Sequence, residues 1–251
     1  MAIINDKPGP HVINGTDYSD TIESNDGNDT VYAKLGDDWV FGGDGDDRLY
    51  GGSKSSPSTF DGNDYLDGGS GNDNIYAGSG NDKVFGGTGN DTLDGWTGND
   101  ELYGGSGNNQ LRGGAGHDYL LGGDNGDRMY GGADNDNLNG GAGSDNLYGG
   151  TGVDTLLGGT GFDWFFFETT DTGDAGAYQA DTIHDFNDFE DVIYLKGSYT
   201  YADNTNAPGD GQYSVWNNGN AWVITWNAVG DVGYHDLLVK GSNPLGDIAF
   251  Y

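Results

Sequence analysis

The chain has 251 residues, of which 50 are glycine, and its 41 acidic residues against 9 Lys and Arg give a net charge of -32. Such a charge repels phosphate groups, which makes nucleic acid a poor partner and disfavours anionic membranes. Disordered acidic chains are poor in aromatic residues, whereas this chain has 16 Tyr, 10 Phe and 6 Trp. We therefore expect a folded chain whose negative charge is compensated by cations.

Residues 1–14 are expected to form a lead-in to a repeat. Their sequence, MAIINDKPGPHVIN, has neither the basic segment nor the long apolar segment of a cleavable secretory signal. No run of 18 apolar residues occurs in the chain, so no membrane insertion is expected. The chain contains no cysteine, which excludes disulfides and thiolate chemistry.

A nine-residue unit repeats sixteen times between residues 15 and 166, and the stretch GGTGNDTLDGWTGNDELYGGSGNNQLRGG (86–114) shows three of its passes. An insert at residues 53–60 interrupts the spacing once, as a surface loop of a stacked repeat allows. Position 6 is Asn109 in one unit and aspartate in the other fifteen: Asp20, Asp29, Asp38, Asp47, Asp64, Asp73, Asp82, Asp91, Asp100, Asp118, Asp127, Asp136, Asp145, Asp154 and Asp163. Position 8 is apolar in all sixteen units, from Ile22 to Phe165.

This unit predicts an all-β fold, a parallel β-roll. Positions 7–9 form a three-residue strand whose position-8 side chain points inward. Glycines at positions 1, 2 and 4 allow turn conformations that other residues resist. Two units then make one turn of the roll, and stacked turns give two parallel sheets around a thin apolar core. One apolar side chain per unit contributes about 1.5–3 kcal/mol, whereas ordering the backbone costs about 1–2 kcal/mol per residue, so a further interaction must stabilise the fold.

Calcium is the interaction that we expect. Stacking brings the position-6 carboxylates of units n and n+2 together beside turn carbonyls, and such all-oxygen sites of about six ligands suit Ca²⁺. Sixteen units contain up to 14 of these pairs, and 14 Ca²⁺ ions would carry a charge of +28 against the net charge of -32. Because an amide offers only one neutral oxygen, the two sites that Asn109 shares with Asp91 and Asp127 should be weaker or empty.

The unit resembles the GGxGxDxUx nonapeptide of RTX (repeats-in-toxin, haemolysin-type calcium-binding) proteins. The resemblance covers residues 15–166 and implies a calcium-binding β-roll. Some units depart from the pattern: Tyr18, Asn125 and Asp134 replace the position-4 glycine, and Ala77 and Trp96 replace a glycine of the pair. These departures affect individual sites and leave the architecture unchanged.

Residues 167–251 are expected to form a β-rich cap. The segments DWFFFE (163–168) and ADTIHDFNDFEDVIYL (180–195) resemble the region that closes the roll of serralysin-type RTX proteins. That resemblance implies an additional calcium held by Asp181, Asp185 and Asp191. The alternative is that these aspartates are only the polar positions of a capping core. Residues 221–227 and 235–241 then alternate in the manner of a β-hairpin.

The last residues, GDIAFY, resemble the uncleaved signal that type I exporters recognise. The resemblance implies that the chain passes the exporter unfolded, where calcium is scarce, and folds outside. Metal binding to sites that the unfolded chain lacks contributes directly to the free energy of folding, which agrees with this order of events. We therefore expect a secreted, extracellular protein with a type I exporter as a partner.

Position 9 of every second unit forms an outward ladder in one sheet: Tyr32, Tyr50, Tyr76, Asp94, Arg112, Tyr130, Tyr148 and Phe166. Asp94 and Arg112 are neighbours in its middle and are expected to pair. The five tyrosines are candidates for stacking on the sugars of an extracellular polysaccharide or a cell surface. The alternative is that tyrosine simply suits the surface of a strand.

No catalytic pattern accompanies these features. The four histidines form no HExxH pair, and the chain has no GxSxG elbow, P-loop or EF-hand loop. We expect a non-enzymatic calcium-binding protein. One alternative is a carbohydrate-binding or surface-attachment module, and another is the C-terminal RTX domain of a larger secreted enzyme or toxin.

Overall fold

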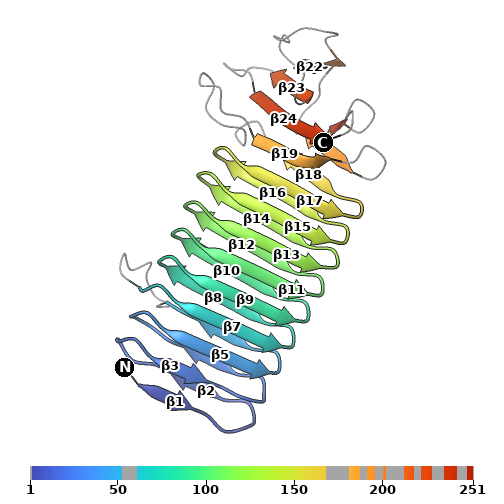
Figure 1. The fold of residues 1–251 in the computed structure, drawn as a ribbon. Coiled ribbons are helices and arrows are strands. Elements are labelled where there is room, and N and C mark those ends of the chain that lie inside the picture. Colours follow the sequence, from blue (N-terminus) through green and yellow to red (C-terminus); the bar gives the residue numbers. More distant parts are fainter. Residues whose placement is uncertain are drawn as a thin grey trace.

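The computed structural model describes residues 2–52, 61–167, 181–186, 191–195, 200–201, 212–217, 222–227, 235–241 and 248–250. These residues form 25 strands and no helix, so none of them belongs to a helix that could cross a membrane. Figure 1 shows the strands stacked into an elongated solenoid, with the N-terminus at one end and the C-terminal strands at the other. The structure confirms the predicted parallel β-roll.

Successive strands of the roll alternate between two sheets, so each strand pairs in parallel with the second strand after it. The 14-stranded sheet contains, in spatial order, β1 (Ile3–Asn5), β3 (Thr21–Glu23), β5 (Trp39–Asp44), β7 (Tyr65–Ser70), β9 (Lys83–Thr88), β11 (Glu101–Ser106), β13 (Tyr119–Asp124), β15 (Asn137–Ala142), β17 (Thr155–Thr160), β19 (Asp181–Phe186), β24 (His235–Gly241), β23 (Trp222–Asn227), β22 (Gln212–Asn217) and β21 (Thr200–Tyr201). The 11-stranded sheet contains β2 (Val12–Asn14), β4 (Thr30–Tyr32), β6 (Arg48–Tyr50), β8 (Asn74–Ser79), β10 (Thr92–Thr97), β12 (Gln110–Ala115), β14 (Arg128–Ala133), β16 (Asn146–Thr151), β18 (Trp164–Phe167), β20 (Val192–Leu195) and β25 (Ile248–Phe250).

The core is a pair of apolar columns made by the position-8 side chains. All sixteen of these side chains, from Ile22 to Phe165, are fully buried. The register places each one beside the equivalent residue of the next turn, as Leu93 lies beside Leu111. The predicted core is therefore confirmed.

Most strands are longer than the three residues that the unit predicts. From β7 to β17 each strand has six residues and continues through the glycine pair to position 3 of the next unit. The position-1 glycines have no side chain, so the backbones of neighbouring turns approach closely there: a Cβ atom on Gly86 would lie 2.6 Å from the carbonyl oxygen of Gly104. The prediction of three residues was wrong because the glycine pair, taken as part of the turn, also belongs to the sheet.

The solenoid extends beyond the nonapeptide pattern at both ends. In the lead-in, Ile4 pairs with Ile22 and Ile13 pairs with Val31, so β1 and β2 form a divergent first turn. At the other end, Ile183 of β19 pairs with Leu156, and Ile193 of β20 pairs with Phe165. The apolar columns thus continue on both sides of residues 15–166, although the repeat itself stops there.

The C-terminal strands complete the 14-stranded sheet with a change of direction. Strand β24 pairs in parallel with β19, whereas β23 pairs with β24 and β22 pairs with β23 in antiparallel fashion. The hairpin expected over residues 221–227 and 235–241 is confirmed in this pairing. The predicted insert, residues 53–60, lies outside the described residues.

Several non-glycine residues that replace glycines of the repeat keep the glycine backbone conformation, although Tyr18 does not. Trp96, Asn125 and Asp134 have φ angles of 76°, 71° and 77°, in the left-handed region that disfavours side chains. Asn and Asp tolerate this region best, so Trp96 carries the largest conformational penalty. Its register partners, Gly78 and Gly114, are both glycine with positive φ.

We expect Trp96→Gly to raise the free energy of unfolding by about 1 kcal/mol, because it removes this penalty from a side chain that is 44% exposed. The measurement is urea unfolding in saturating calcium. Asn125→Gly is the matched control and should change the stability less. A loss of stability in Trp96→Gly would show that contacts of the indole outweigh its backbone strain.

Candidate metal centre

The position-6 side chains form two columns, one beside each sheet. The first column contains Asp20, Asp38, Asp64, Asp82, Asp100, Asp118, Asp136, Asp154 and Asp181, and the second contains Asp29, Asp47, Asp73, Asp91, Asn109, Asp127, Asp145, Asp163 and Asp191. Within each column the backbone N–H of one member donates to Oδ1 of the next, over distances from 2.7 to 3.1 Å. Each carboxylate therefore connects two adjacent turns through one of its oxygens.

The other carboxylate oxygen, Oδ2, is buried without a hydrogen-bond partner in 15 aspartates, namely all those of the two columns except Asp20 and Asp191. A buried polar atom in a folded protein normally has a partner, and an ionised oxygen without one is costly. The same carboxylate oxygen lacks a hydrogen bond at equivalent positions of successive turns, which indicates that one kind of ligand binds at all of these positions.

The surroundings of Oδ2 show what kind of ligand fits. A Cβ atom placed on Gly86 would lie 2.5 Å from Oδ2 of Asp91 and 2.6 Å from the carbonyl oxygen of Gly104. Two acceptor oxygens thus converge over a glycine that has no side chain to separate them. The same arrangement recurs in the first column, for example at Gly95 with Asp100 and the carbonyl of Gly113.

Burial raises the pKa of most column aspartates, because the charged form loses its hydration. The pKa is about 9 for Asp64 and about 8 for Asp100 and Asp136. It is about 7 for Asp38, Asp73, Asp82, Asp127 and Asp163, and about 6 for Asp47, Asp91, Asp118 and Asp145. The metal-free columns therefore favour protons, and a cation is the other way to neutralise them.

These residues fit calcium. The ligands offered are carboxylate and carbonyl oxygens, which a hard cation prefers. Every member of the first column from Asp20 to Asp181 is an aspartate, and so is every member of the second column from Asp29 to Asp191 except Asn109. The neighbouring turns supply both kinds of oxygen at every step, so one type of site can repeat along the roll.

Asn109 breaks the second column. Its Oδ1 accepts the N–H of Asp91 at 2.9 Å, which fixes the orientation of the amide and places Nδ2 where the aspartates have Oδ2. Nδ2 donates to the carbonyl of Gly107 at 3.3 Å. An amide N–H group at this place repels a cation, which supports the prediction of weak or empty sites around Asn109.

Asp20, the first member of its column, differs from the other predicted ligands. Thr16 donates its N–H and its hydroxyl to Oδ2 of Asp20 at 2.7 and 2.8 Å. Burial acts to raise the pKa of Asp20, but these hydrogen bonds and one from Ala2 outweigh it, and the pKa lies below its ordinary value. Hydrogen bonds thus satisfy this carboxylate within the protein.

The three C-terminal aspartates do not form one cluster. Asp181 and Asp191 extend the two columns by accepting the N–H groups of Asp154 and Asp163. Asp185 instead accepts the N–H groups of Gly158 and Gly159, at 3.0 and 2.8 Å. The structure therefore places Asp181 and Asp191 at the ends of the two columns, whereas Asp185 binds the backbone of a glycine pair and lies close enough to Asp163 to help raise its pKa.

The sequence reasoning missed a second ladder, formed by position 5 on the outside of the turns. There the N–H of one unit donates to the side-chain oxygen of the unit two before it, as His117 donates to Asn99 at 2.8 Å and Asn108 donates to Asn90 at 2.7 Å. The recurrence of asparagine directly before the aspartate was its signal in the sequence. The ladder links the turns without any metal.

We expect Asn99→Ala to lower the free energy of unfolding by about 0.5–1.5 kcal/mol, the usual contribution of one hydrogen bond, because water can replace the lost acceptor at this exposed position. The calcium midpoint should hardly change. Urea unfolding and calcium titration of the same variant check both statements. A large shift of the calcium midpoint would instead make Asn99 part of a metal site.

Asp61 is a further buried carboxylate that the pattern did not single out. It follows the insert at position 3, a variable position of the unit, and is 3% exposed. Ser79 donates its N–H to Oδ2 of Asp61 at 3.4 Å. An open groove of about 370 Å³ lies beside it. Asp61 also helps to raise the pKa of Asp64.

The aromatic ladder has the predicted register. Rings stack at centroid distances of 4.9 Å for Tyr32 and Tyr50, 5.1 Å for Tyr50 and Tyr76, 4.6 Å for Tyr130 and Tyr148, and 4.3 Å for Tyr148 and Phe166. In the middle, Asp94 lies beside Arg112, whose guanidinium lies 5.6 Å from the Tyr130 ring centroid. Because stacked rings cover each other's faces, a sugar meets mainly ring edges along this ladder. Glycan binding by these tyrosines stays a prediction.

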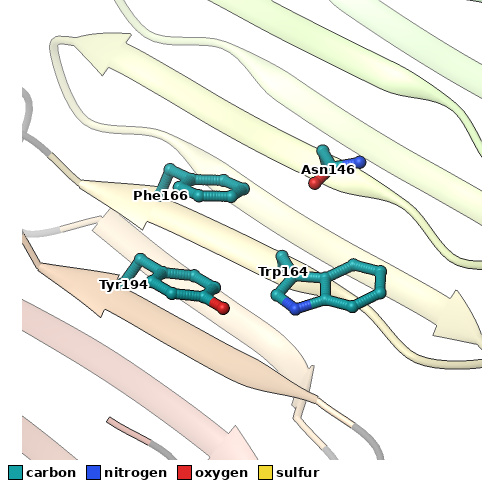
Figure 2. A pocket seen from close by; sticks show the side chains of 4 residues that line it. All are labelled: Asn146, Trp164, Phe166 and Tyr194. Carbon is teal, nitrogen blue, oxygen red and sulfur yellow. The ribbon is translucent and has the colours of Figure 1, made fainter. Parts of the chain in front are cut away.

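The ladder ends beside an open groove of about 470 Å³, lined by Asn146, Trp164, Phe166 and Tyr194. Figure 2 shows the rings of Phe166 and Tyr194 lying one over the other, with Trp164 beside them on the same face. The centroids of Phe166 and Tyr194 are 4.8 Å apart. The register partner of Tyr194 on the other side is Ala249, so the aromatic stack stops at Tyr194.

Comparison with known proteins agrees with this geometry. The family model of the RTX calcium-binding nonapeptide repeat, in its four-copy form, matches residues 12–40, 23–53, 58–93, 94–129 and 130–165. A comparison with curated proteins gives no match. The matched segments cover more than half of the chain and contain the column residues from Asp20 to Asp163, and the family binds calcium through this repeat. The chain therefore belongs to the RTX calcium-binding nonapeptide repeat family.

Proposed function

We propose that this protein is a secreted, non-enzymatic calcium-binding β-roll whose folding depends on Ca²⁺. The observation that carries the proposal is the set of 15 buried Oδ2 atoms without a hydrogen-bond partner. Apolar burial is limited to thin columns, so the roll lacks the core that would offset the burial of so many carboxylate oxygens without hydrogen bonds.

The residues proposed to hold calcium are the column aspartates together with the position-1 carbonyls of the adjacent turns. Bound Ca²⁺ supplies the positive charge that lets these carboxylates stay ionised in the interior. Oδ1 of each aspartate fixes the register by accepting an N–H from the neighbouring turn, which leaves Oδ2 for the ion. Because the unfolded chain has no such sites, the binding free energy is available for folding.

Export as an unfolded chain follows from the same dependence. Where calcium is scarce the stacked carboxylates within each column repel one another, so the chain remains open to a type I exporter, and it folds after release into a calcium-rich medium. In the folded protein, Ile248–Phe250 pairs with β20 at the end of the 11-stranded sheet. A C-terminal signal in this segment would therefore be accessible before folding and paired afterwards.

Deletion of the last five residues tests the export step. Secretion from a host with a type I exporter should be lost, whereas calcium-induced folding of the purified variant should remain. Continued secretion of the truncated chain would refute the signal, and failure of both secretion and folding would show that β25 is needed for the fold.

The test of the main proposal is a calcium titration followed by far-UV circular dichroism. We expect a cooperative change from coil to β structure between about 10⁻⁴ and 10⁻³ M Ca²⁺, the range of extracellular calcium modules. Mg²⁺ at the same concentrations is the control and should not replace Ca²⁺, because it demands a tighter octahedral site. A chain that is fully folded in chelator would contradict calcium-dependent folding.

Carbohydrate attachment is the second candidate function, and the groove beside Trp164 is the observation that favours it. The groove combines aromatic rings with the amide of Asn146, a combination suited to a neutral sugar. The acidic surface would repel anionic glycans. Trp164→Ala should abolish binding to neutral polysaccharides in calcium, whereas Trp39→Ala, a change of an exposed tryptophan on the other sheet, should not. Absence of binding by the unmodified protein would remove this candidate.

A further inference from the structure

The lead-in is a divergent copy of the nonapeptide, and its differences are concentrated at one point. His11 lies 18 residues before Asp29 and stands at position 6, and Asp6 then stands at position 1, where most later units have glycine. The structure confirms this alignment, because the N–H of His11 donates to Oδ1 of Asp29 at 2.7 Å, the bond that every later column member makes. The second column therefore begins with an imidazole in place of a carboxylate.

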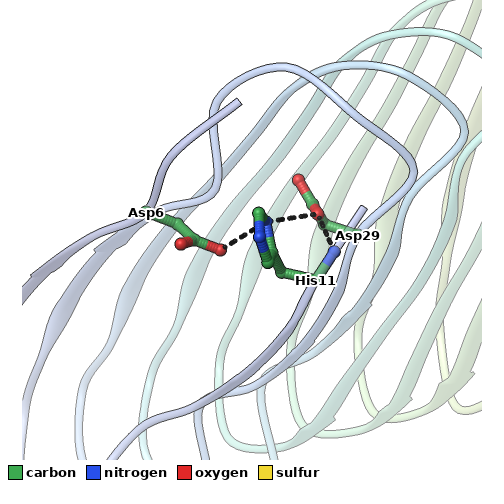
Figure 3. Close-up of side chains that lie close together, drawn as sticks. All are labelled: Asp6, His11 and Asp29. Atoms are coloured by element: carbon green, nitrogen blue, oxygen red, sulfur yellow. Dashed lines mark hydrogen bonds and ion pairs between the residues drawn. The ribbon is translucent and has the colours of Figure 1, made fainter. Parts of the chain in front are cut away.

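The three side chains converge at the end of this column. Nδ1 of His11 lies 3.0 Å from Oδ2 of Asp6 and 4.0 Å from Oδ1 of Asp29. One ligand atom from each residue lies within 4.8 Å of the other two. Figure 3 shows the imidazole between the two carboxylates. Asp6 directly follows β1, His11 directly precedes β2, and Asp29 directly precedes β4.

Asp29 also has an unsatisfied atom. The residue is 1% exposed, and its Oδ2 has no hydrogen-bond partner. Burial is the largest influence on Asp29 and raises its pKa. Asp29 thus has the same unsatisfied Oδ2 as the interior aspartates, and the imidazole of His11 lies 4.0 Å from its other carboxylate oxygen, Oδ1.

We propose that Asp6, His11 and Asp29 form a binding site for a transition-metal ion of the Zn²⁺ class at the N-terminal end of the roll. Imidazole nitrogen is a good ligand for Zn²⁺ and its neighbours in the transition series, whereas Ca²⁺ prefers oxygen alone. One imidazole and two carboxylates leave a fourth position of a tetrahedral site for water.

The site would join the lead-in to the roll. Asp6 and His11 belong to the first turn and Asp29 to the next, so an ion held by all three links β1 and β2 to the repeat. The inference needs the folded roll but does not depend on whether calcium drives the folding.

Binding of Co²⁺ and Zn²⁺ to the full chain in saturating Ca²⁺ tests the proposal. Co²⁺ is the optical probe, since a tetrahedral site with nitrogen and oxygen ligands gives visible absorption bands, and Zn²⁺ should displace it. We expect one such site per chain. Circular dichroism of the same samples shows that the roll is folded, which separates this outcome from the calcium proposal.

Three variants assign the site. His11→Ala should weaken Zn²⁺ binding by more than the roughly 10–100-fold that loss of an outer-shell partner causes. His11→Asp should abolish the cobalt bands while leaving Ca²⁺ binding intact, because it restores an all-oxygen column. His117→Asn is the matched control at an exposed histidine of the position-5 ladder and should leave the bands unchanged. Unchanged Zn²⁺ binding in His11→Ala, or complete displacement of Zn²⁺ by Ca²⁺, would overturn the proposal and leave His11 and Asp6 as an ion pair only.

Discussion

In calcium-free buffer, lowering the pH from about 8 to about 5 should convert the unfolded chain substantially into β structure. Burial raises the pKa of twelve column aspartates from 3.8 to between about 6, as for Asp91, and about 9, as for Asp64. The folded metal-free roll therefore binds protons that the unfolded chain has already released. The stability contributed by these protons is fully present below the unfolded pKa of 3.8 and is lost as the pH rises through the folded pKa values.

Far-UV circular dichroism against pH, without calcium and with residual metal quantified, measures this effect. Added NaCl at the higher pH is the control, since salt screens exposed charges but does not protonate buried carboxylates. The calcium midpoint should also rise on acidification, because protons and Ca²⁺ compete for the same oxygens. A β content that is independent of pH, or that NaCl restores equally well, would show that the columns do not control folding.

The core and the columns were predictable because one rule is repeated sixteen times. Residues such as Leu93 and Asp91 recur at a fixed spacing, and stacking at 18 residues then places equal positions beside each other. The family match follows from the same periodicity. The register of the aromatic ladder, with Asp94 beside Arg112, needed no information beyond this spacing.

Other features depend on geometry that the pattern does not contain. Whether Asn90 faces water or the neighbouring turn is decided by the turn conformation, and so is the separation of Asp185 from Asp181. The glycine pair belongs to both the turn and the sheet, which composition alone does not reveal. The place of His11 in the second column could have been predicted, because it precedes Asp29 by one full turn of 18 residues. The surrounding lead-in, however, lacks most of the glycines that made the later units recognisable.

Asp127→Ala should lower the free energy of unfolding in saturating calcium by about 2–4 kcal/mol, because it leaves a buried donor without its charged acceptor and removes a ligand from two adjoining sites. The lost acceptor is Oδ1, which receives the N–H of Asn109 at 2.7 Å. Asn109→Ala also removes an acceptor, that of the Asp91 N–H, but no charged ligand, so about 1–2 kcal/mol is expected. The calcium midpoint should rise in Asp127→Ala and hardly move in Asn109→Ala.

The variant Asn109→Asp gives the sharpest test of the column, because it replaces the one amide of the column by the carboxylate that the other members have. In calcium-free buffer the added buried charge should destabilise the roll further, whereas saturating calcium should reverse the sign and give a variant that binds more Ca²⁺ than the parent chain. Equilibrium dialysis supplies the stoichiometry, and urea unfolding in saturating calcium supplies the stability with the metal. For the calcium-free comparison, the pH midpoint of folding should fall in Asn109→Asp, because one more buried carboxylate must be protonated. Equal midpoints for Asp127→Ala and Asn109→Ala, or an unchanged stoichiometry in Asn109→Asp, would mean that the ions are not held by the column in this register.

The outcome matters for the whole roll, because Asn109 divides the second column into two groups of aspartates while the first column runs unbroken beside it. If the Oδ2 atoms without hydrogen-bond partners bind calcium, then in the turns around Asn109 only the first column can supply calcium sites that stabilise the fold.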